Sequence, residues 1–210
     1  MTKVIIADDH PIFRAGLVQT INREVDLKVV DEFENGEELL SRLSSVEFDA
    51  AIIDIDLPGR NGIEVLKEIK KLKPGIPVLI LSAYSEERYG VRAIQAGANA
   101  YISKDENKST LLESLRRIKG NKKFITPKLA EILARELDNT SDKALHEKLS
   151  DRELEVMRHI ALGKSVSDIA ELLSLSVNTI NTYRARIMEK MGMKSNTQLA
   201  LYALENKLIE

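Results

Sequence analysis

The side chains with the clearest chemical potential in this chain are carboxylates that close an apolar run. The run 50–56 is apolar without a helical stripe, ends on Asp54 and Asp56, and is followed by Pro58 and Gly59. Such a run is typical of a strand buried on both faces of a parallel sheet. Because a buried carboxylate is costly unless it is paired or bound to a cation, we expect Asp54 at the edge of the sheet, facing a crevice.

Complementary side chains stand at the ends of other apolar runs. Asp8 and Asp9 follow the first run, Ser82 ends a later one, and Lys104 comes directly after another. The carboxyl ends of parallel strands lie at one edge of a sheet. Three carboxylates, a hydroxyl and an ammonium group are therefore expected to converge around Asp54.

A bound cation and an anion would explain this combination. Three neighbouring carboxylates repel one another unless a hard divalent cation is present, and Mg²⁺ suits a few carboxylates with retained waters. Lys104 and Ser82 would then face the other side of an anion held by the metal. Because phosphoryl transfer depends mainly on positioning and charge neutralisation, the pattern predicts a phosphoryl group on Asp54. The aspartate pair could also cap the following helix, and the residues do not decide whether His10 is merely a loop residue.

Strand and helix patterns alternate through the first 120 residues. Apolar runs predict strands over 3–7, 27–33, 50–55, 78–82 and 100–103. Helical periodicity predicts helices over 11–21, 36–45, 62–72, 86–96 and 109–119. Right-handed crossovers must cover the sheet, so we expect an α/β fold with a doubly wound five-stranded parallel sheet.

The composition narrows the class of protein. The chain has 210 residues, 43% of them apolar and 30% charged, with a net charge of -2 and no cysteine. These values are ordinary for a globular protein and exclude disulfides, thiol nucleophiles and cysteine-ligated zinc. The N-terminus has no signal-peptide pattern and no apolar stretch approaches membrane length, so we expect a cytosolic protein that has no membrane partner.

The pattern changes after residue 120. Residues 127–137 form a short amphipathic helical pattern, and 138–143 are polar and rich in helix breakers, which favours a linker. We therefore expect a domain over 1–120, a linker with a short helix over 121–145, and a second domain over 146–210.

The second domain has a purely helical pattern. Its helices are predicted over 150–162, 166–173, 177–191 and 196–206, with a tight turn at 174–176. Two helices joined by so short a turn are typical of a helix-turn-helix. The longer helix and the residues after it carry Arg184, Arg186, Lys190 and Lys194 against Glu189. This local basic patch suits phosphate contacts in a DNA major groove.

The first domain resembles the receiver domain of bacterial two-component response regulators. The resemblance rests on Asp8-Asp9, Asp54, Leu57-Pro58-Gly59, Asn61-Gly62, Ser82-Ala83, Ala96-Gly97-Ala98 and Tyr101-Ile102-Ser103-Lys104. It implies the flavodoxin-like strand order 2-1-3-4-5 and phosphoryl transfer to Asp54 from a sensor histidine kinase. It also implies that Mg²⁺ is held by Asp8, Asp9, Asp54 and the backbone carbonyl of Asp56. Lys104 would pair with the phosphoryl group, Ser82 would move to bond it, and Tyr101 would rotate inward.

The second domain resembles LuxR/FixJ/NarL-type DNA-binding domains, and its recognition helix resembles the GacA/BvgA branch. The resemblance rests on 149–153, 163–165, 169–170, 179–184 and 187–192. By position it implies base contacts by Asn181, Thr182 and Ala185. It implies backbone contacts by Thr179, Tyr183, Arg184, Arg186 and Lys190. The last helix would contribute to a homodimer on paired half-sites, and RNA polymerase is a further candidate partner.

Together these features predict a phosphorylation-activated transcription regulator that binds double-stranded DNA. We expect no enzymatic activity beyond weak phosphotransfer and self-dephosphorylation. One alternative is a hydrolase that turns over at Asp54, which release of phosphate from a phosphomonoester would reveal. Another is a protein-interaction module whose helical domain binds a protein partner, which failure to shift any duplex at low salt would favour.

Overall fold

The computed structural model describes residues 1–138 and 144–209. The chain divides into two compact units, Met1–Ala134 (unit 1) and Arg135–Glu210 (unit 2). Most of the predicted linker 138–143 therefore lies outside the described residues.

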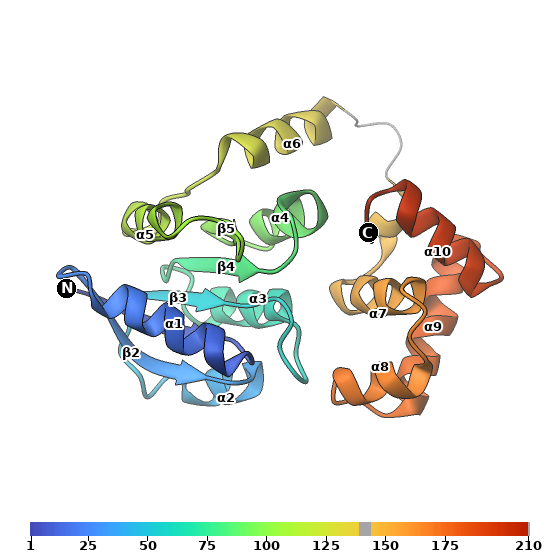
Figure 1. Cartoon of the computed structure of the whole chain (residues 1–210), viewed down its shortest axis with the longest axis horizontal. Helices are drawn as coiled ribbons and strands as arrows, with labels where there is room; N and C mark the ends of the chain where they lie inside the picture. Colours follow the sequence, from blue (N-terminus) through green and yellow to red (C-terminus); the bar gives the residue numbers. More distant parts are fainter. Residues whose placement is uncertain (139–143, 210) are drawn as a thin grey trace. The chain divides into compact units, whose positions relative to one another are not determined.

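Unit 1 is a parallel sheet of five strands in the order β2-β1-β3-β4-β5. Figure 1 shows β2, β3, β4 and β5 following one another in this order. The strands are β1 Thr2–Ala7, β2 Leu27–Phe33, β3 Ala50–Ile53, β4 Val78–Ser82 and β5 Ala100–Ser103. The helices are α1 Pro11–Asn22, α2 Gly36–Arg42, α3 Gly62–Leu72, α4 Glu86–Gln95 and α5 Lys108–Arg117. The next helix, α6 Pro127–Asp138, begins in unit 1 and extends past its last residue. The predicted α/β class and strand order are confirmed.

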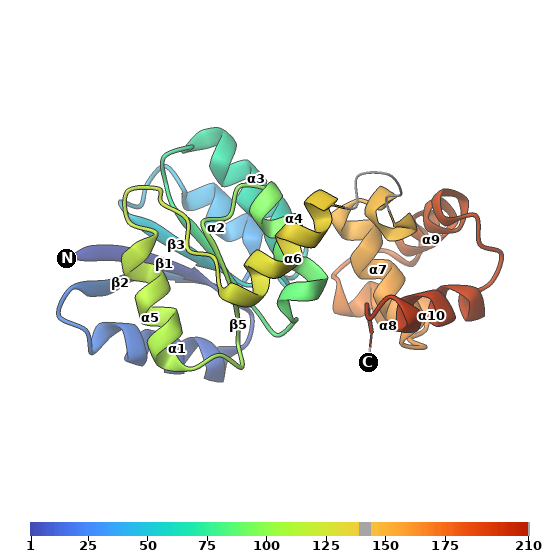
Figure 2. The same ribbon diagram turned by 90° about the horizontal axis from the view of Figure 1, so that it is seen from above.

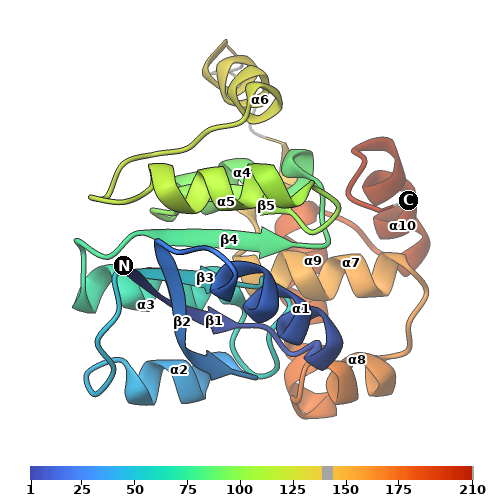
Figure 3. The same cartoon turned by 60° about the vertical axis from the view of Figure 1, so that its left-hand side comes forward.

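Helices cover both faces of this sheet. Figure 2 shows α1 and α5 on one side and α2 and α3 on the other. Leu17 of α1 and Leu115 of α5 pack with alternate strand residues such as Ile6 in one buried cluster. All four residues of β3 are buried, as expected for the central strand of a doubly wound sheet. Figure 3 shows this strand between β1 and β4.

The third helix begins where the chain passes against the end of β3. A Cβ atom on Gly62 would lie 1.9 Å from the Asp54 carbonyl oxygen and 2.9 Å from Ile55 Cα. The Gly62 amide also donates to the Ile55 carbonyl at 2.8 Å. Glycine at this position therefore lets α3 approach the backbone that carries Asp54.

Replacing Gly62 by alanine is expected to destabilise unit 1, because the added methyl group meets backbone that cannot move without displacing Asp54. We expect the free energy of unfolding to fall by about 2–3 kcal/mol. Urea unfolding measures this change. Gly16→Ala is the matched control, because Gly16 is also helical and nothing lies within 4 Å of the position that its methyl group would take. Equal unfolding midpoints for the two variants would refute the close-approach argument.

Unit 2 consists of helices in the described range. They are α7 Asp151–Ala161, α8 Val166–Leu172, α9 Val177–Met191 and α10 Asn196–Glu205, preceded by the short 3-10 helix Leu145–Lys148. A capping box begins α7, because Ser150 and Glu153 exchange hydrogen bonds there. Within the described ranges, no helix is both long enough and apolar enough to cross a membrane.

A buried apolar core fixes the helix-turn-helix of unit 2. Ile169 of α8 and both Ile180 and Ile187 of α9 are fully buried. Between the two helices, Ser174 adopts a left-handed conformation with φ 53°, and the Leu175 amide donates to the Ala170 carbonyl at 2.8 Å. This turn closes α8 and presents α9, whose other side is exposed.

Candidate functional sites

Backbone pairing continues past the strands and holds the chemical side chains of unit 1 in place. The Asp54 amide donates to the Ala7 carbonyl at 2.8 Å, and the Lys104 amide donates to the Ser82 carbonyl at 2.7 Å. Asp8 is held in the same way, because its amide donates to the Phe33 carbonyl at the end of β2. The site residues are therefore extensions of neighbouring strands at the carboxyl edge of the sheet.

Lys104 joins two buried carboxylates. Its Nζ lies 2.6 Å from Asp54 Oδ2 and 2.7 Å from Asp8 Oδ2. The side chains of Asp54 and Asp8 are 2% and 3% exposed, and that of Lys104 is 10% exposed. Water therefore screens this triad little, and removing the Lys104 ammonium would leave two buried carboxylates without their counter-charge.

Burial dominates the electrostatics of Asp54. Loss of solvation raises the pKa of Asp54 to about 6, although the Lys104 ammonium opposes this shift. Burial also disfavours the charged Lys104, but the two carboxylates outweigh it and raise the pKa of Lys104. The carboxylate form of Asp54, which a nucleophile requires, is thus favoured above about pH 6.

The raised pKa makes the stability of the cation-free protein depend on Asp54. A folded-state pKa above the unfolded value adds stability below the unfolded pKa, and this stability is lost as the pH rises through about 6. Between pH 5 and pH 7 we expect the wild type to lose about 1 kcal/mol that Asp54→Asn does not lose. Urea unfolding of both proteins in chelator tests this, since titrating groups remote from Asp54 cancel in the difference. If the wild type and Asp54→Asn differed in unfolding free energy by the same amount at pH 5 and pH 7, this expectation would be contradicted.

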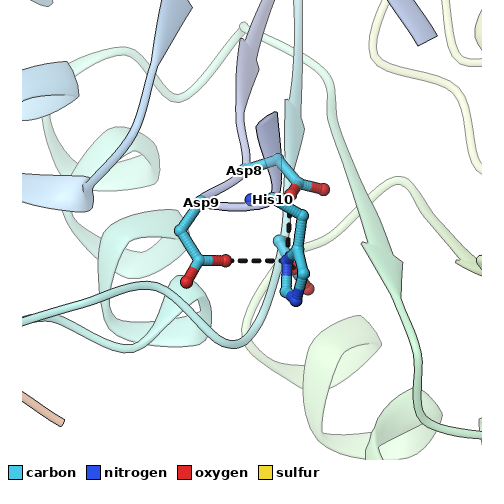
Figure 4. A group of neighbouring side chains, drawn as sticks. Asp8, Asp9 and His10 are labelled. Atoms are coloured by element: carbon cyan, nitrogen blue, oxygen red, sulfur yellow. Dashed lines mark hydrogen bonds and ion pairs between the residues drawn. The ribbon is translucent and has the colours of Figure 1, made fainter. Parts of the chain in front are cut away.

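Asp9 and His10 lie at the open side of the same cluster. The Nδ1 atom of His10 is 2.8 Å from Asp9 Oδ1, and Asp9 is 35% exposed. Figure 4 shows the His10 ring beside Asp8 and Asp9. One ligand atom from each of Asp8, Asp9, His10 and Asp54 lies within 4.8 Å of the others.

The carboxylates of this donor set fit Mg²⁺. Six ligands at about 2.1 Å separate opposite donors by about 4.2 Å and adjacent donors by about 3.0 Å. Small side-chain adjustments of Asp8, Asp9 and Asp54 would bring their oxygens to such positions. The acidic cluster predicted from the sequence is therefore present at one point of the structure.

Ser82 ends β4 at this edge, and Tyr101 lies in the neighbouring strand β5. Ser82 is fully buried, and its Oγ accepts from the Tyr84 amide at 3.2 Å. The Tyr101 ring is also fully buried, and its hydroxyl donates to the Tyr84 carbonyl at 2.7 Å. Both side chains thus contact the loop between β4 and α4. In this structure Tyr101 is already inside, and its rotation on phosphorylation stays a prediction.

The predicted DNA-contacting residues lie on α9. Asn181, Thr182, Ala185, Arg186 and Lys190 are exposed, whereas Thr179, Tyr183 and Arg184 are half-buried. Thr182 Oγ1 donates to the Asn178 carbonyl at 2.9 Å, which occupies the single donor of this hydroxyl group.

Two cations of α9 have protein partners. Lys190 Nζ lies 2.5 Å from Glu153 Oε2, whose side chain is 3% exposed. Arg184 Nε donates to Asn196 Oδ1 at 3.0 Å, which leaves the outer guanidinium nitrogens available. The sequence predicts DNA contacts for Lys190 and Arg184 because they are charged. Their protein partners lie 37 and 12 residues away in the sequence, so no local pattern indicates these contacts.

Unit 1 and unit 2 together define a class of protein. A 2-1-3-4-5 parallel sheet with acids at its carboxyl edge is a receiver fold, and unit 2 is a helix-turn-helix domain. The comparisons agree, since residues 4–116 match the response regulator receiver domain and residues 147–203 match bacterial regulatory proteins of the luxR family.

Several similar proteins match this chain over nearly its whole length. The response regulator GacA of Pseudomonas aeruginosa is 29% identical over 100% of this chain and 99% of its own. The DNA-binding transcriptional activator EvgA of Escherichia coli K12 is 33% identical over 97% of this chain and 98% of its own. A structure of RcsB from Salmonella enterica serovar Typhimurium, bound to a promoter in the presence of phosphomimetic BeF3-, matches with TM-score 0.67. It is 25% identical and covers 96% of this chain and 97% of that one. The chain belongs to the response regulators that combine a receiver domain with a LuxR-type DNA-binding domain.

Proposed function

We propose that Asp54 accepts a phosphoryl group from a sensor histidine kinase and that this modification strengthens promoter binding by unit 2. The observation that supports this most is the buried triad of Asp8, Asp54 and Lys104 beside the acidic cluster. A carboxylate held against an ammonium and a cation site has what phosphoryl transfer needs, namely position and charge neutralisation.

The proposed chemistry assigns a role to each group. Asp54 Oδ attacks the phosphorus atom, the bond to the donor's leaving group breaks, and an acyl phosphate forms. Asp8, Asp9, Asp54 and the Asp56 carbonyl would hold Mg²⁺, which would supply charge neutralisation for the phosphoryl oxygens. Lys104 exchanges its bond to the Asp54 carboxylate for one to a phosphoryl oxygen. Turnover is limited to this transfer and slow self-dephosphorylation.

The response would pass through the loop between β4 and α4. Ser82 Oγ leaves the Tyr84 amide to bond the phosphoryl group, and Tyr84 also accepts from the Tyr101 hydroxyl. A change at Tyr84 therefore reaches the start of α4 and the end of β5. In this way the charge of the phosphoryl group on Asp54 would favour one of two arrangements of the loop between β4 and α4.

The fourth helix also contacts the segment that leads out of the receiver. Thr126 Oγ1 donates to Glu86 Oε1 at 2.7 Å, and Lys128 Nζ lies 3.0 Å from Glu87 Oε1. Leu129 is fully buried and packs over Gly90, where a Cβ atom would lie 2.6 Å from it. We propose that a shift of α4 changes how the linker 121–145 leaves domain 1–120, and so acts on domain 146–210.

For unit 2 we propose the DNA contacts that are expected from the positions of its residues on α9. Asn181, Thr182 and Ala185 would meet base edges, with asparagine suited to adenine and the threonine methyl suited to thymine. Backbone contacts would come from Thr179, Tyr183, Arg184, Arg186 and Lys190. The promoter complex of the similar protein RcsB supports double-stranded DNA as the partner. Phosphorylated homodimers would read paired half-sites, with RNA polymerase as a further partner.

Selection of bound fragments from sheared genomic DNA tests the proposed function. Purified full-length protein is incubated with fragments at fixed salt, with and without a small phosphodonor and Mg²⁺. We expect a shared sequence motif to be enriched and the enrichment to increase with the donor. Enrichment of no fragments under either condition would contradict DNA reading, and identical enrichment would contradict the switch.

Replacing Arg186 or Arg184 by alanine is expected to weaken binding to most duplexes alike, because each arginine contacts phosphates. We expect the slope of log affinity against log salt to decrease in magnitude by about one for each phosphate that is no longer neutralised. Fluorescence anisotropy at several salt concentrations measures both quantities. Arg23→Ala, at an exposed position in unit 1, is the control with the same charge change. Loss of discrimination at a single base pair would contradict the backbone role.

A further inference from the structure

The ring of His10 lies among the carboxylates of the cation site. Its Nδ1 atom is 2.8 Å from Asp9 Oδ1, 3.2 Å from Asp8 Oδ1 and 3.7 Å from Asp54 Oδ2. Figure 4 shows the dashed contacts from this ring to the neighbouring aspartates. The side chain comes from the N-cap of α1, and the His10 amide donates to Asp8 Oδ1 at 2.8 Å. The turn that positions Asp8 and Asp9 therefore also positions this nitrogen.

The spacing of these atoms is that of ligands around one ion. Adjacent ligands of a six-coordinate ion with bonds of about 2.1–2.2 Å are separated by about 3.0 Å. The separations of His10 Nδ1 from Asp9 and Asp8, 2.8 and 3.2 Å, lie on either side of this value. With its proton on Nε2, a neutral imidazole offers the Nδ1 lone pair in this direction. The ring is 60% exposed, so small rotations meet little resistance.

The combination of carboxylate oxygen and imidazole nitrogen ligands determines which ions the site prefers. Mg²⁺ is a hard cation that takes oxygen ligands and keeps its waters, so it gains little from imidazole. Divalent transition metals such as Mn²⁺ and Co²⁺ bind both carboxylate and imidazole, and their affinities rise along that series. A site of three carboxylates and one imidazole therefore discriminates between the two groups of ions.

We propose that His10 Nδ1 is a metal ligand that gives the phosphorylation site a preference for Mn²⁺ and Co²⁺ over Mg²⁺. This inference rests on the proposed function, because it uses the same cation site. Asp8, Asp9 and Asp54 supply oxygen ligands for every ion, and His10 adds a nitrogen ligand for transition metals. The competing arrangement, in which His10 only contacts Asp9 and leaves when an ion binds, is an outcome of the test.

Pulsed electron paramagnetic resonance of bound Mn²⁺ tests the ligand directly. The sample is tag-free full-length protein with a substoichiometric amount of Mn²⁺. We expect a nitrogen coupling typical of directly bound imidazole, its loss in His10→Ala, and its retention in the control His146→Ala. Mn²⁺ bound without this coupling, or a coupling that persists in His10→Ala, would overturn the role of His10. Absence of Mn²⁺ binding by the wild type would overturn the cation site itself.

Calorimetric titration gives a second readout that needs no phosphoryl transfer. We expect His10→Gln to weaken Co²⁺ binding by about tenfold or more, because one ligand is removed, and to change Mg²⁺ binding by less than about twofold. Equal changes for both ions, or no change for Co²⁺, would contradict the proposal. The far-ultraviolet spectrum of the variant confirms that it is folded.

Discussion

Replacing Asp54 by asparagine is expected to abolish the incorporation of acid-labile phosphate from a small phosphodonor. The amide oxygen is a poor nucleophile and cannot form the acyl phosphate, whereas the wild type should approach stoichiometric labelling with Mg²⁺. The amide nearly matches the carboxylate in shape and removes one of the buried charges, so the fold should persist. Labelled acetyl phosphate followed by acid treatment and intact-mass analysis measures the result.

Two further variants make this outcome specific. Asp105→Asn makes the same chemical change at an exposed position next to Lys104, and we expect wild-type labelling. Asp9→Asn keeps the nucleophile but removes a metal ligand, so its labelling should recover when the Mg²⁺ concentration is raised. Labelling of Asp54→Asn at the wild-type level would place the modification elsewhere and remove the basis of the proposed function.

Replacing Lys104 by methionine is expected to destabilise the cation-free protein by about 3 kcal/mol near neutral pH. Lys104 holds Asp8 and Asp54 at 2.7 and 2.6 Å, and its removal leaves two buried carboxylates facing each other. The variant should also respond more strongly to Mg²⁺ than the wild type does, because a bound cation compensates the same two charges. Urea unfolding with chelator and with Mg²⁺ measures both effects.

The matched control for this substitution is Lys108→Met. The Lys108 side chain is 50% exposed and its Nζ lies 3.8 Å from a Glu24 oxygen, so the same chemical change should cost less than about 0.5 kcal/mol. If Lys104→Met and Lys108→Met unfolded at the same urea concentration, the buried triad would not stabilise the fold as we infer.

Much of the fold could be predicted because its signals are local in the sequence. The apolar run that ends at Asp54 and the tight turn at 174–176 each depend on neighbours in the chain. Parallel topology then brings the strand ends together, which is why Asp8, Asp54 and Lys104 could be expected in one cluster. The structure adds the distances and the burial on which the electrostatics depend.

What could not be predicted depends on contacts between distant residues. The short 3-10 helix Leu145–Lys148 has too few residues for periodicity, and the His146 ring in it contacts the Tyr202 hydroxyl at 2.9 Å. Its positive charge predicts a DNA contact for Lys190, but the structure shows that Lys190 also forms an ion pair with Glu153. The position of His10 depends on the turn geometry before α1, for which residue type alone gives no signal.

Element ends also differ where side-chain patterns say little about the backbone. The helix expected to extend to residue 45 ends at Arg42, because the Leu43 amide donates to the Leu40 carbonyl in a tighter turn. The strand expected to extend to residue 55 ends at Ile53, the last residue paired with β1. Apolar residues continue beyond both ends, so hydrophobicity alone extends each element too far.

The dissociation constant for one duplex recovered by the genomic selection tests the central claim most directly. It is measured at fixed salt for wild type and Asp54→Asn, each with and without phosphodonor and Mg²⁺. We predict that the donor tightens wild-type binding by about 5- to 150-fold, the usual range of allosteric coupling, and leaves Asp54→Asn unchanged. Equal tightening of both proteins, or no tightening of the wild type once Asp54 carries phosphate, would contradict the proposal that this aspartate controls DNA binding.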